Sequence, residues 1–132
     1  MVFVDTSAWF AVSVPTDRDH QAAQEWLAQN DALLVTSDYV LDELLTLLKV
    51  RGEYRRALCI GESLLAGKAA RIEWVLPPDV EAAWRSYTRF RDKEWSFTDC
   101  VSLAVMRRLG IRQAFSFDLH FRQFGSIMVH PA

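Results

Sequence analysis

Val2-Phe3-Val4-Asp5-Thr6-Ser7 is the stretch of sequence that decides the fold. Three apolar residues in succession predict a short central strand that is buried on both faces. Thr6-Ser7 and the apolar residues after them favour a turn into a helix. Asp5 would then lie at the carboxyl end of a core strand, where open α/β sheets bind their ligands. The structural alternative is that Asp5 only caps the helix that follows.

The rest of the chain alternates between strand-like and helix-like segments. We predict strands over residues 2–4, 32–36, 72–76, 114–117 and 127–129, and helices over residues 7–14, 19–30, 37–50, 53–66, 77–91 and 98–109. Strands that alternate with helices favour a mostly parallel sheet. The sequence therefore predicts a single α/β domain over residues 1–132, with about five short strands and helices on both faces of the sheet.

The composition is that of an ordinary globular protein, with 51% hydrophobic and 24% charged residues. No segment approaches the ~20 apolar residues that a membrane span needs. The N-terminus lacks the basic region of a signal peptide, so we expect a cytoplasmic protein without a membrane partner. Cys59 and Cys100 have no metal-type spacing, and we interpret them as buried free thiols.

The two parts of the chain differ in charge, although the net charge is only −2. Residues 1–81 contain 7 Lys+Arg against 13 Asp+Glu, whereas residues 82–132 contain 8 against 4. A basic part next to an acidic part can attract a polyanion locally while the total stays near zero. This asymmetry is compatible with a nucleic-acid partner and does not by itself establish one.

Three further carboxylates stand in apolar surroundings. Glu43 borders the apolar face of the predicted helix 37–50, and Asp99 shares a face of helix 98–109 with apolar residues. Asp118 follows the predicted strand 114–117, as Asp5 follows its own strand. Each has an ordinary structural alternative, because Glu43 can reach water, Asp99 can favour a first helical turn, and Asp118 can cap a turn.

The four acids together carry more information than any one of them. Two carboxyl ends of strands and two inward helix faces can converge at one edge of the sheet. Gathered carboxylates repel one another, and a hard divalent cation removes that repulsion. All-oxygen ligands favour Mg²⁺ or Mn²⁺ over zinc. Such a site is typical of phosphoryl transfer or phosphodiester hydrolysis.

These residues, in this order, resemble the PIN-domain family of Mg²⁺/Mn²⁺-dependent ribonucleases. The resemblance covers essentially the whole chain. It rests on Val4-Asp5-Thr6-Ser7-Ala8, Asp42-Glu43-Leu44, Ser96-Phe97-Thr98-Asp99 with the apolar run after it, and Phe117-Asp118-Leu119-His120-Phe121. A free-standing PIN domain of this size is most similar to the VapC-type toxins, which are the nuclease halves of type II toxin–antitoxin pairs.

The resemblance implies a catalytic, metal-binding cluster and a reaction. The cluster consists of Asp5, Glu43, Asp99 and Asp118, and either Thr6 or Ser7 is a supporting hydroxyl near the metal. The implied reaction is cleavage of single-stranded RNA, in which a water activated by Mg²⁺ or Mn²⁺ attacks the scissile phosphate in line.

The same resemblance implies a homodimer and a cognate antitoxin whose extended tail fills a groove beside the site, with helices 37–50 and 53–66 as candidates. For contacts to the RNA backbone we nominate six basic residues, whose alternative is a solvated helix face. They are Arg85, Arg89, Arg91, Lys93, Arg107 and Arg108. The five tryptophans are candidates for stacking on unpaired bases, although core and interface positions are more usual for this residue. We expect no catalytic role for the three histidines.

Two other classes of function fit an acid-lined α/β domain. A receiver-like signalling module needs adjacent acids after the first strand and a late lysine, but Asp5 stands alone and no lysine follows Lys93. A non-catalytic PIN-fold scaffold that only binds RNA is the other alternative. The four retained acids favour the nuclease over the scaffold.

Overall fold

The computed structural model describes all 132 residues. Five strands form one sheet in the order β3-β2-β1-β4-β5, and every pair in it is parallel. The strands are β1 (Val2–Val4), β2 (Leu34–Ser37), β3 (Arg71–Glu73), β4 (Gln113–Phe115) and β5 (Met128–His130). The predicted α/β fold with a parallel sheet of five short strands is confirmed.

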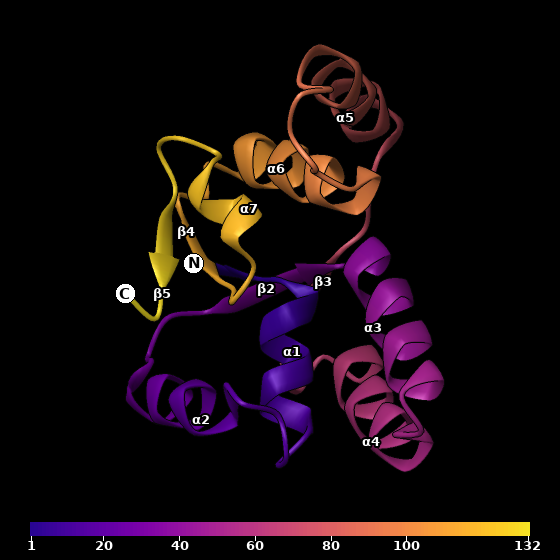
Figure 1. Cartoon of the computed structure of the whole chain (residues 1–132), viewed down its shortest axis with the longest axis vertical. Helices are drawn as coiled ribbons and strands as arrows, with labels where there is room; N and C mark the ends of the chain where they lie inside the picture. The colour runs from indigo at the N-terminus through magenta and orange to yellow at the C-terminus, as the bar shows by residue number, and fades with distance from the viewer.

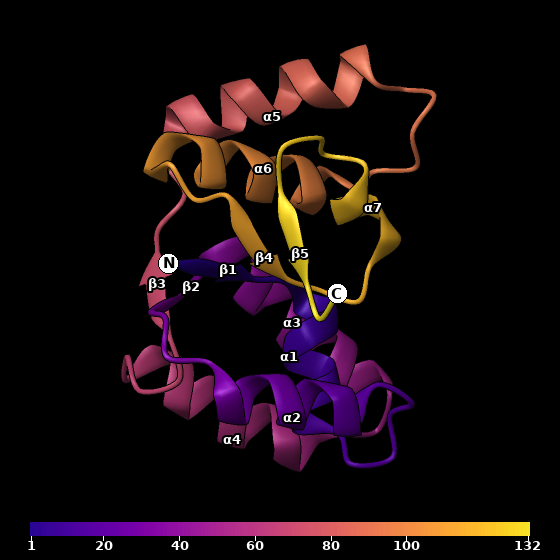
Figure 2. The same cartoon turned by 90° about the vertical axis from the view of Figure 1, so that its left-hand side faces the viewer.

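Helices cover both faces of this sheet. They are α1 (Thr6–Ser13), α2 (His20–Gln29), α3 (Asp38–Val50), α4 (Tyr54–Leu65), α5 (Pro77–Arg89), α6 (Phe97–Leu109) and the short α7 (Leu119–Arg122). In Figure 1, α5 and α6 lie above the sheet while α1, α2 and α4 lie below it, and the turned view in Figure 2 agrees. Helix α3 packs against both α1 and α6. None of the helices combines the length and the apolar character that crossing a membrane requires.

Strand β1 is the centre of the fold, as its apolar sequence predicts. All three of its residues are buried, and it is hydrogen-bonded to β2 on one side and to β4 on the other. Because the strands are parallel, their carboxyl ends meet at one edge of the sheet. Val4 is paired with Phe115, so the residues that follow, Asp5 and Ser116, leave adjacent strands side by side. This register brings the ends of the chain's first and fourth strands to one place.

Most of the predicted bounds agree with the structure to within two residues, and two segments differ more. Strand β3 ends at Glu73 because the backbone N–H of Val75 donates to the Asp38 carboxylate, at 2.8 Å, instead of continuing in the sheet. Helix α7 was not predicted, since four residues are too few to show a helical period. Helix α6 follows the prediction: its residues from Asp99 to Met106 are all buried, and it ends at Gly110 with φ +69°.

Candidate active site

Asp5 lies at the carboxyl end of β1 and caps α1. Its Oδ2 accepts hydrogen bonds from Ser7 Oγ at 2.9 Å and from Ser116 Oγ at 3.0 Å. The residue is only 3% exposed. Burial, together with the nearby charge of Asp99, raises the pKa of Asp5 to about 7 even though the bonds from the two serines act to lower it. A helix cap does not require such burial. Asp5 therefore caps α1 and is also a carboxylate whose ionised form is energetically unfavourable at this position.

Asp99 occupies the first turn of α6 as part of a reciprocal capping arrangement. Its backbone N–H donates to Ser96 Oγ at 3.0 Å, and its Oδ2 accepts from the backbone N–H of Ser96 at 3.0 Å. The side chain is nevertheless directed inward and is 5% exposed. Burial raises the pKa of Asp99, and the charge of Asp118 adds to this, against the bonds from Ser96 and His120 that lower it.

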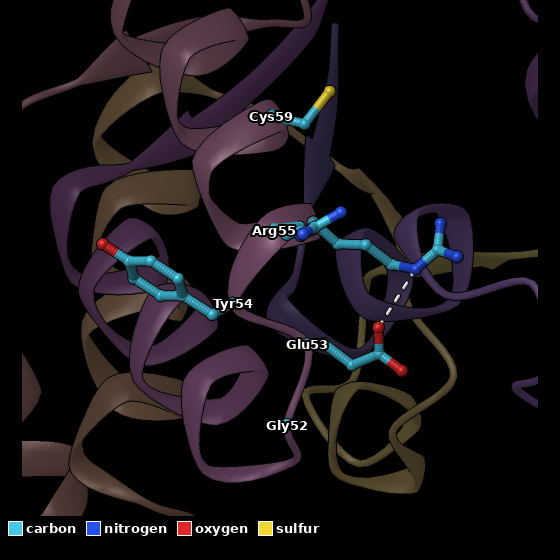
Figure 3. Close-up of a pocket in the computed structure, with 6 residues that line it drawn as sticks. Gly52, Glu53, Tyr54, Arg55 and Cys59 are labelled. Atoms are coloured by element: carbon cyan, nitrogen blue, oxygen red, sulfur yellow. Dashed lines mark hydrogen bonds and ion pairs between the residues drawn. The ribbon is translucent and has the colours of Figure 1, made fainter.

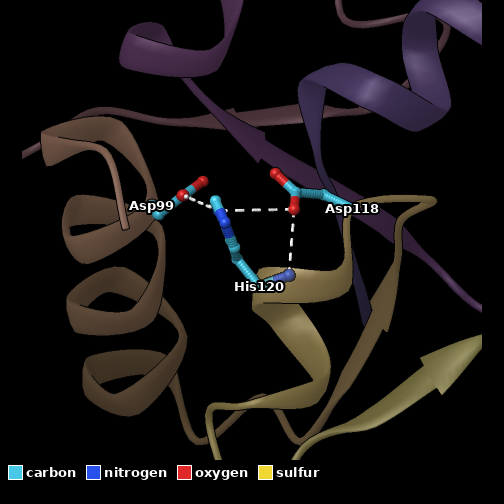
Figure 4. A group of neighbouring side chains, drawn as sticks. All are labelled: Asp99, Asp118 and His120. Atoms are coloured by element: carbon cyan, nitrogen blue, oxygen red, sulfur yellow. Dashed lines mark hydrogen bonds and ion pairs between the residues drawn. The ribbon is translucent and has the colours of Figure 1, made fainter. Parts of the chain in front are cut away.

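Asp118 and His120 face Asp99 from the start of α7, as Figure 4 shows. Asp118 Oδ1 accepts from the backbone N–H of His120 at 2.9 Å. The His120 ring lies between the two acids, with Nδ1 at 3.0 Å from Asp99 Oδ2 and at 3.4 Å from Asp118 Oδ1. Burial lowers the pKa of His120, but the bond to Asp99 and the charges of Asp118 and Asp99 outweigh it and leave this pKa raised.

Ser116 connects Asp5 to this group. Its Oγ contacts Asp5 Oδ2 and accepts from the backbone N–H of Asp118 at 3.0 Å. Ser7 Oγ in turn accepts from the backbone N–H of Phe117 at 2.9 Å. A continuous series of polar contacts therefore runs from Asp5 through Ser116 to Asp118, and through His120 to Asp99.

Glu43 is on α3, half-buried, and makes no hydrogen bond or ion pair. Leu47, one turn further along the same face of α3, lines a surface hollow together with Ser7 and Phe117. Ser7 is two residues after Asp5, and Phe117 immediately precedes Asp118. The face of α3 that bears Glu43 is therefore turned toward the other acids, although Glu43 contacts none of them.

The residues present fit a divalent cation. Asp99, Asp118 and His120 each offer a ligand atom, and these atoms lie within 4.8 Å of one another. The hydroxyl of Thr6, next to Asp5, is buried and has no hydrogen-bond partner. Carboxylate and hydroxyl oxygens are the ligands that Mg²⁺ and Mn²⁺ prefer. Burial, with the charge of a neighbouring acid added to it, raises the pKa values of Asp5 and Asp99, and a bound cation would stabilise both carboxylates in their ionised form.

The PIN-domain family model matches residues 2–126 of the chain. The chain belongs to the PIN-domain family. It is 37% identical over 131 residues to the 23S rRNA-specific endonuclease VapC20 of Mycobacterium tuberculosis, with 99% of each protein covered. It is 27% identical over 117 residues to the ribonuclease VapC26 of the same species, with 89% of this chain and 86% of that protein covered.

Solved structures agree with this assignment. The crystal structure of M. tuberculosis VapC20, described as a toxin that cleaves the sarcin–ricin loop, superposes with a TM-score of 0.89 at 35% identity and covers 95% of both chains. A toxin–antitoxin complex from Klebsiella pneumoniae has a TM-score of 0.70 at 12% identity, covering 97% of this chain and 96% of that one, which shows a shared fold.

The basic residues nominated for RNA contacts divide into two groups in this PIN domain. Arg85, Arg89 and Arg107 line one surface hollow, and none of them has an acid within ion-pair distance. Arg91 and Lys93 are exposed in the segment after α5. Lys93 lies 4.0 Å from Asp92, whereas the other four side chains have no acidic partner and are available to a polyanion.

Arg108 is different, because its guanidinium is already engaged. Nε lies 2.9 Å from Asp79 Oδ1, Nη2 lies 3.0 Å from Asp79 Oδ2, and Nη1 lies 3.1 Å from Glu73 Oε1. Burial acts to raise the pKa of Asp79, but the bonds from Arg108 outweigh it and hold that pKa below its usual value. Arg108 thus joins α6 to α5 and β3, which is a structural role.

Two residues of this candidate site were missed in the sequence. We expected no catalytic role for His120. The feature of the sequence that could have indicated its place in the site is its position two residues after Asp118, which is the spacing of a capped turn. Ser116 was not singled out either. Pairing of β1 with β4 places the residue after β4 beside the residue after β1, and a prediction of this pairing could have indicated Ser116.

One further hollow of this PIN domain, shown in Figure 3, lies at the start of α4. Residues 52–56 and Cys59 line it, and Glu53 Oε2 accepts from Arg56 Nε at 3.0 Å. Cys59 is exposed, so the prediction of a buried thiol is wrong at this position, whereas it is confirmed for Cys100. None of the four acids is part of the lining of the hollow. We therefore attach the candidate chemistry to the carboxyl edge of the sheet and not to this hollow.

Proposed function

We propose that this chain is a metal-dependent endoribonuclease that hydrolyses RNA phosphodiester bonds and acts as the toxin of a type II toxin–antitoxin pair. The observation that carries the proposal is the convergence of Asp5, Asp99 and Asp118 at one edge of a PIN-domain sheet. The similarity to VapC20, an rRNA endonuclease, extends over the full chain and also supports the proposal. With RNA as the substrate, we place its action in the cytoplasm.

The cation in this proposal is Mg²⁺ or Mn²⁺, held by Asp5, Asp99 and Asp118, with Glu43 as the fourth acid. When bound, it supplies an activated water and neutralises the charge that develops on the leaving oxygen. The chain's own groups prepare the site: Ser7 and Ser116 orient the Asp5 carboxylate through Oδ2. The buried Thr6 hydroxyl is a supporting oxygen donor.

His120 has a separate part in the proposed site. Its Nδ1 contacts Asp99 and Asp118 at once and so fixes the distance between them. Because its pKa is raised, the imidazole keeps a proton to higher pH than a free histidine does. It thereby offsets the repulsion between the two carboxylates when no other cation is present.

The substrate class follows from the basic surface and from the relatives. We propose that Arg85, Arg89, Arg91, Lys93 and Arg107 contact RNA phosphates, and that Arg108 does not, because Asp79 and Glu73 occupy it. Since VapC20 is named for 23S rRNA and its crystal structure for the sarcin–ricin loop, a structured RNA with an unpaired loop is the first substrate to test.

The proposed protein partners are a cognate antitoxin and a second copy of the chain. An apolar groove runs between α3 and α4 and is lined by Leu45, Leu58 and Leu65. Leu58 and Leu65 are exposed, and an extended antitoxin tail is the occupant that we propose for this groove. We further propose that the chain forms a homodimer. Sedimentation of the purified protein measures its oligomeric state.

RNA cleavage by the purified protein tests the proposal. We expect internal cuts in a loop-containing RNA in the presence of Mg²⁺ or Mn²⁺, and no cuts in EDTA. Asp5→Asn should abolish cleavage, whereas Asp42→Asn, which changes an exposed acid on α3, should not. Metal-independent RNA binding without cleavage would contradict the nuclease and favour a scaffold, and phosphate uptake from acetyl phosphate would favour a signalling module.

A further inference from the structure

Three aromatic side chains form a row that leads from the outer surface of α5 to the start of α6. Trp84 and Tyr87 are stacked, with ring centroids 6.0 Å apart and planes at 25°. Tyr87 meets Phe97 edge-on, at 5.8 Å and 78°. We call these three residues the α5 aromatic row. Its last member, Phe97, begins α6 and precedes Asp99 by two residues.

Trp84 and Tyr87 are not part of the core. Trp84 is 58% exposed and Tyr87 is 45% exposed. Other tryptophans of the chain have clear packing roles: the indole N–H of Trp9 donates to Thr36 at 3.2 Å, and that of Trp95 donates to Gln123 at 2.8 Å. The indole of Trp84 has no hydrogen bond, and its ring packs on Tyr87 alone among the aromatic residues. Its outer surface is free.

Basic side chains without acidic partners lie close to the row. Residues 81–94 contain four basic side chains against three acids, which are Glu81, Asp92 and Glu94. Of the basic ones, Arg85, Arg89 and Arg91 have no acidic partner, and Lys93 lies at the 4.0 Å limit from Asp92. Exposed aromatic rings beside unpaired arginines are the two components of surfaces that bind single-stranded nucleic acid. The rings stack on bases, and the cations contact phosphates.

Helices α5 and α6 pack along each other, and Figure 2 shows the end of α5 near the beginning of α6. Phe97, the last ring of the row, lies in the same first turn of α6 as Asp99. These two side chains project about 200° apart on the helix, so the Phe97 ring meets Tyr87 of α5 while the Asp99 carboxylate meets His120. The row therefore lies on the outer side of α6, across that helix from the proposed cleavage site.

We propose that the α5 aromatic row is a binding subsite for unpaired RNA bases, which stack on Trp84 and Tyr87 and hold the substrate against the outer side of α5 and α6. This inference rests on the proposed ribonuclease function and adds a feature of the substrate that is recognised: unpaired bases outside the cleavage site itself. Double-stranded RNA has its bases stacked internally, so it cannot use the row.

Binding measured without cleavage tests this subsite separately from the nuclease. A fluorescein-labelled RNA hairpin with an unpaired loop is titrated with protein in EDTA, and anisotropy gives the dissociation constant. Trp84→Ala and Tyr87→Ala should each weaken binding by at least about fivefold, because one base–aromatic stack contributes roughly 5- to 150-fold by alanine substitution. Trp84→Phe, which keeps a ring, should retain most of the affinity. A blunt duplex of the same stem should bind all variants equally.

Trp74→Ala is the matched control. Trp74 is 59% exposed, like Trp84, but it has no aromatic partner. Its carbonyl oxygen lies 3.5 Å from Arg108 Nη2. Arg108 is eleven residues along α6 from Phe97, or roughly 16 Å at 1.5 Å per residue. Trp74→Ala should leave hairpin binding unchanged.

The outcomes separate the two proposals. Unchanged hairpin affinity in Trp84→Ala and Tyr87→Ala would overturn the subsite, even if the protein cleaves RNA. Ring-dependent binding by a protein that never cleaves RNA with Mg²⁺ or Mn²⁺ would leave the subsite standing and overturn the nuclease. Sedimentation of the same variants gives the remaining outcome: a dimer that dissociates in Trp84→Ala would assign this face to a second copy of the chain and overturn the subsite.

Discussion

The buried Asp5 carboxylate makes the metal-free protein sensitive to pH, and Asp5→Asn should remove much of that sensitivity. In the folded chain the pKa of Asp5 is raised from 3.8 to about 7, chiefly by burial. The folded state therefore keeps a proton that the unfolded state has lost, and stability falls as pH rises from about 4 to about 7.

The shift sets the size of the effect. One pKa unit corresponds to about 1.4 kcal/mol, so the raised pKa of Asp5 lowers the stability of the fold by about 4 kcal/mol at pH 8, where the folded state holds the ionised carboxylate, and by about 2 kcal/mol at pH 5, where folding requires uptake of a proton. Asparagine cannot ionise, yet it can cap α1 and can still accept from Ser7 and Ser116. The stability of Asp5→Asn relative to wild type should therefore increase by about 2 to 3 kcal/mol between pH 5 and pH 8.

Thermal and urea denaturation in EDTA, followed by circular dichroism, measures this difference. For a domain of this size we expect the melting temperature of Asp5→Asn to gain roughly 10 °C over wild type between the two pH values. Asp42→Asn, at an exposed position, is the control and should follow wild type at both. An Asp5→Asn variant that is less stable than wild type at pH 8, or whose difference from wild type does not depend on pH, would refute the reasoning and make Asp5 a structural cap.

Three further substitutions have expected outcomes. Ser116→Ala removes a bond to Asp5 and one from the backbone of Asp118, so it should cost about 1 to 2 kcal/mol in urea denaturation and slow RNA cleavage. Arg108→Ala leaves the buried Asp79 unpaired and should cost about 3 kcal/mol, whereas the exposed Arg85→Ala should change stability by less than about 0.5 kcal/mol. Equal losses in these two arginine variants would contradict the structural role of Arg108. Arg89→Ala should reduce the slope of log K against log salt for single-stranded RNA by about 0.7, and Arg55→Ala on α4 should leave that slope unchanged.

Much of the fold could be predicted from local patterns. The apolar run before Asp5 predicted the central strand, and the nearly continuous apolar sequence of α6 predicted a buried helix. Asp99 shows why such predictions reach the site as well, because its place among apolar residues on one helix face indicated that it points inward. These features depend on a few neighbouring residues, which is the information that periodicity contains.

The remaining features depend on pairs of residues that are distant in the sequence. Arg107 and Arg108 look alike in the sequence, but they project about 100° apart on α6, and only Arg108 meets Asp79 on α5. His120 reaches Asp99 across 21 positions, from a helix too short to be predicted. Ser116 meets Asp5 across 111 positions through the pairing of β1 with β4. Local patterns contain no information about such contacts.

A titration of Mn²⁺ into the metal-free protein, followed by electron paramagnetic resonance of the free ion, tests the central claim most directly. We expect saturable binding by the wild type. Loss of a residue that only supports a metal ligand weakens metal binding by roughly 10- to 100-fold. Loss of a ligand itself in Asp99→Asn should weaken Mn²⁺ binding by at least this much. Asp42→Asn should bind like the wild type. Absence of binding in the wild type, or equal binding in Asp99→Asn, would contradict the claim that these acids together hold a divalent cation.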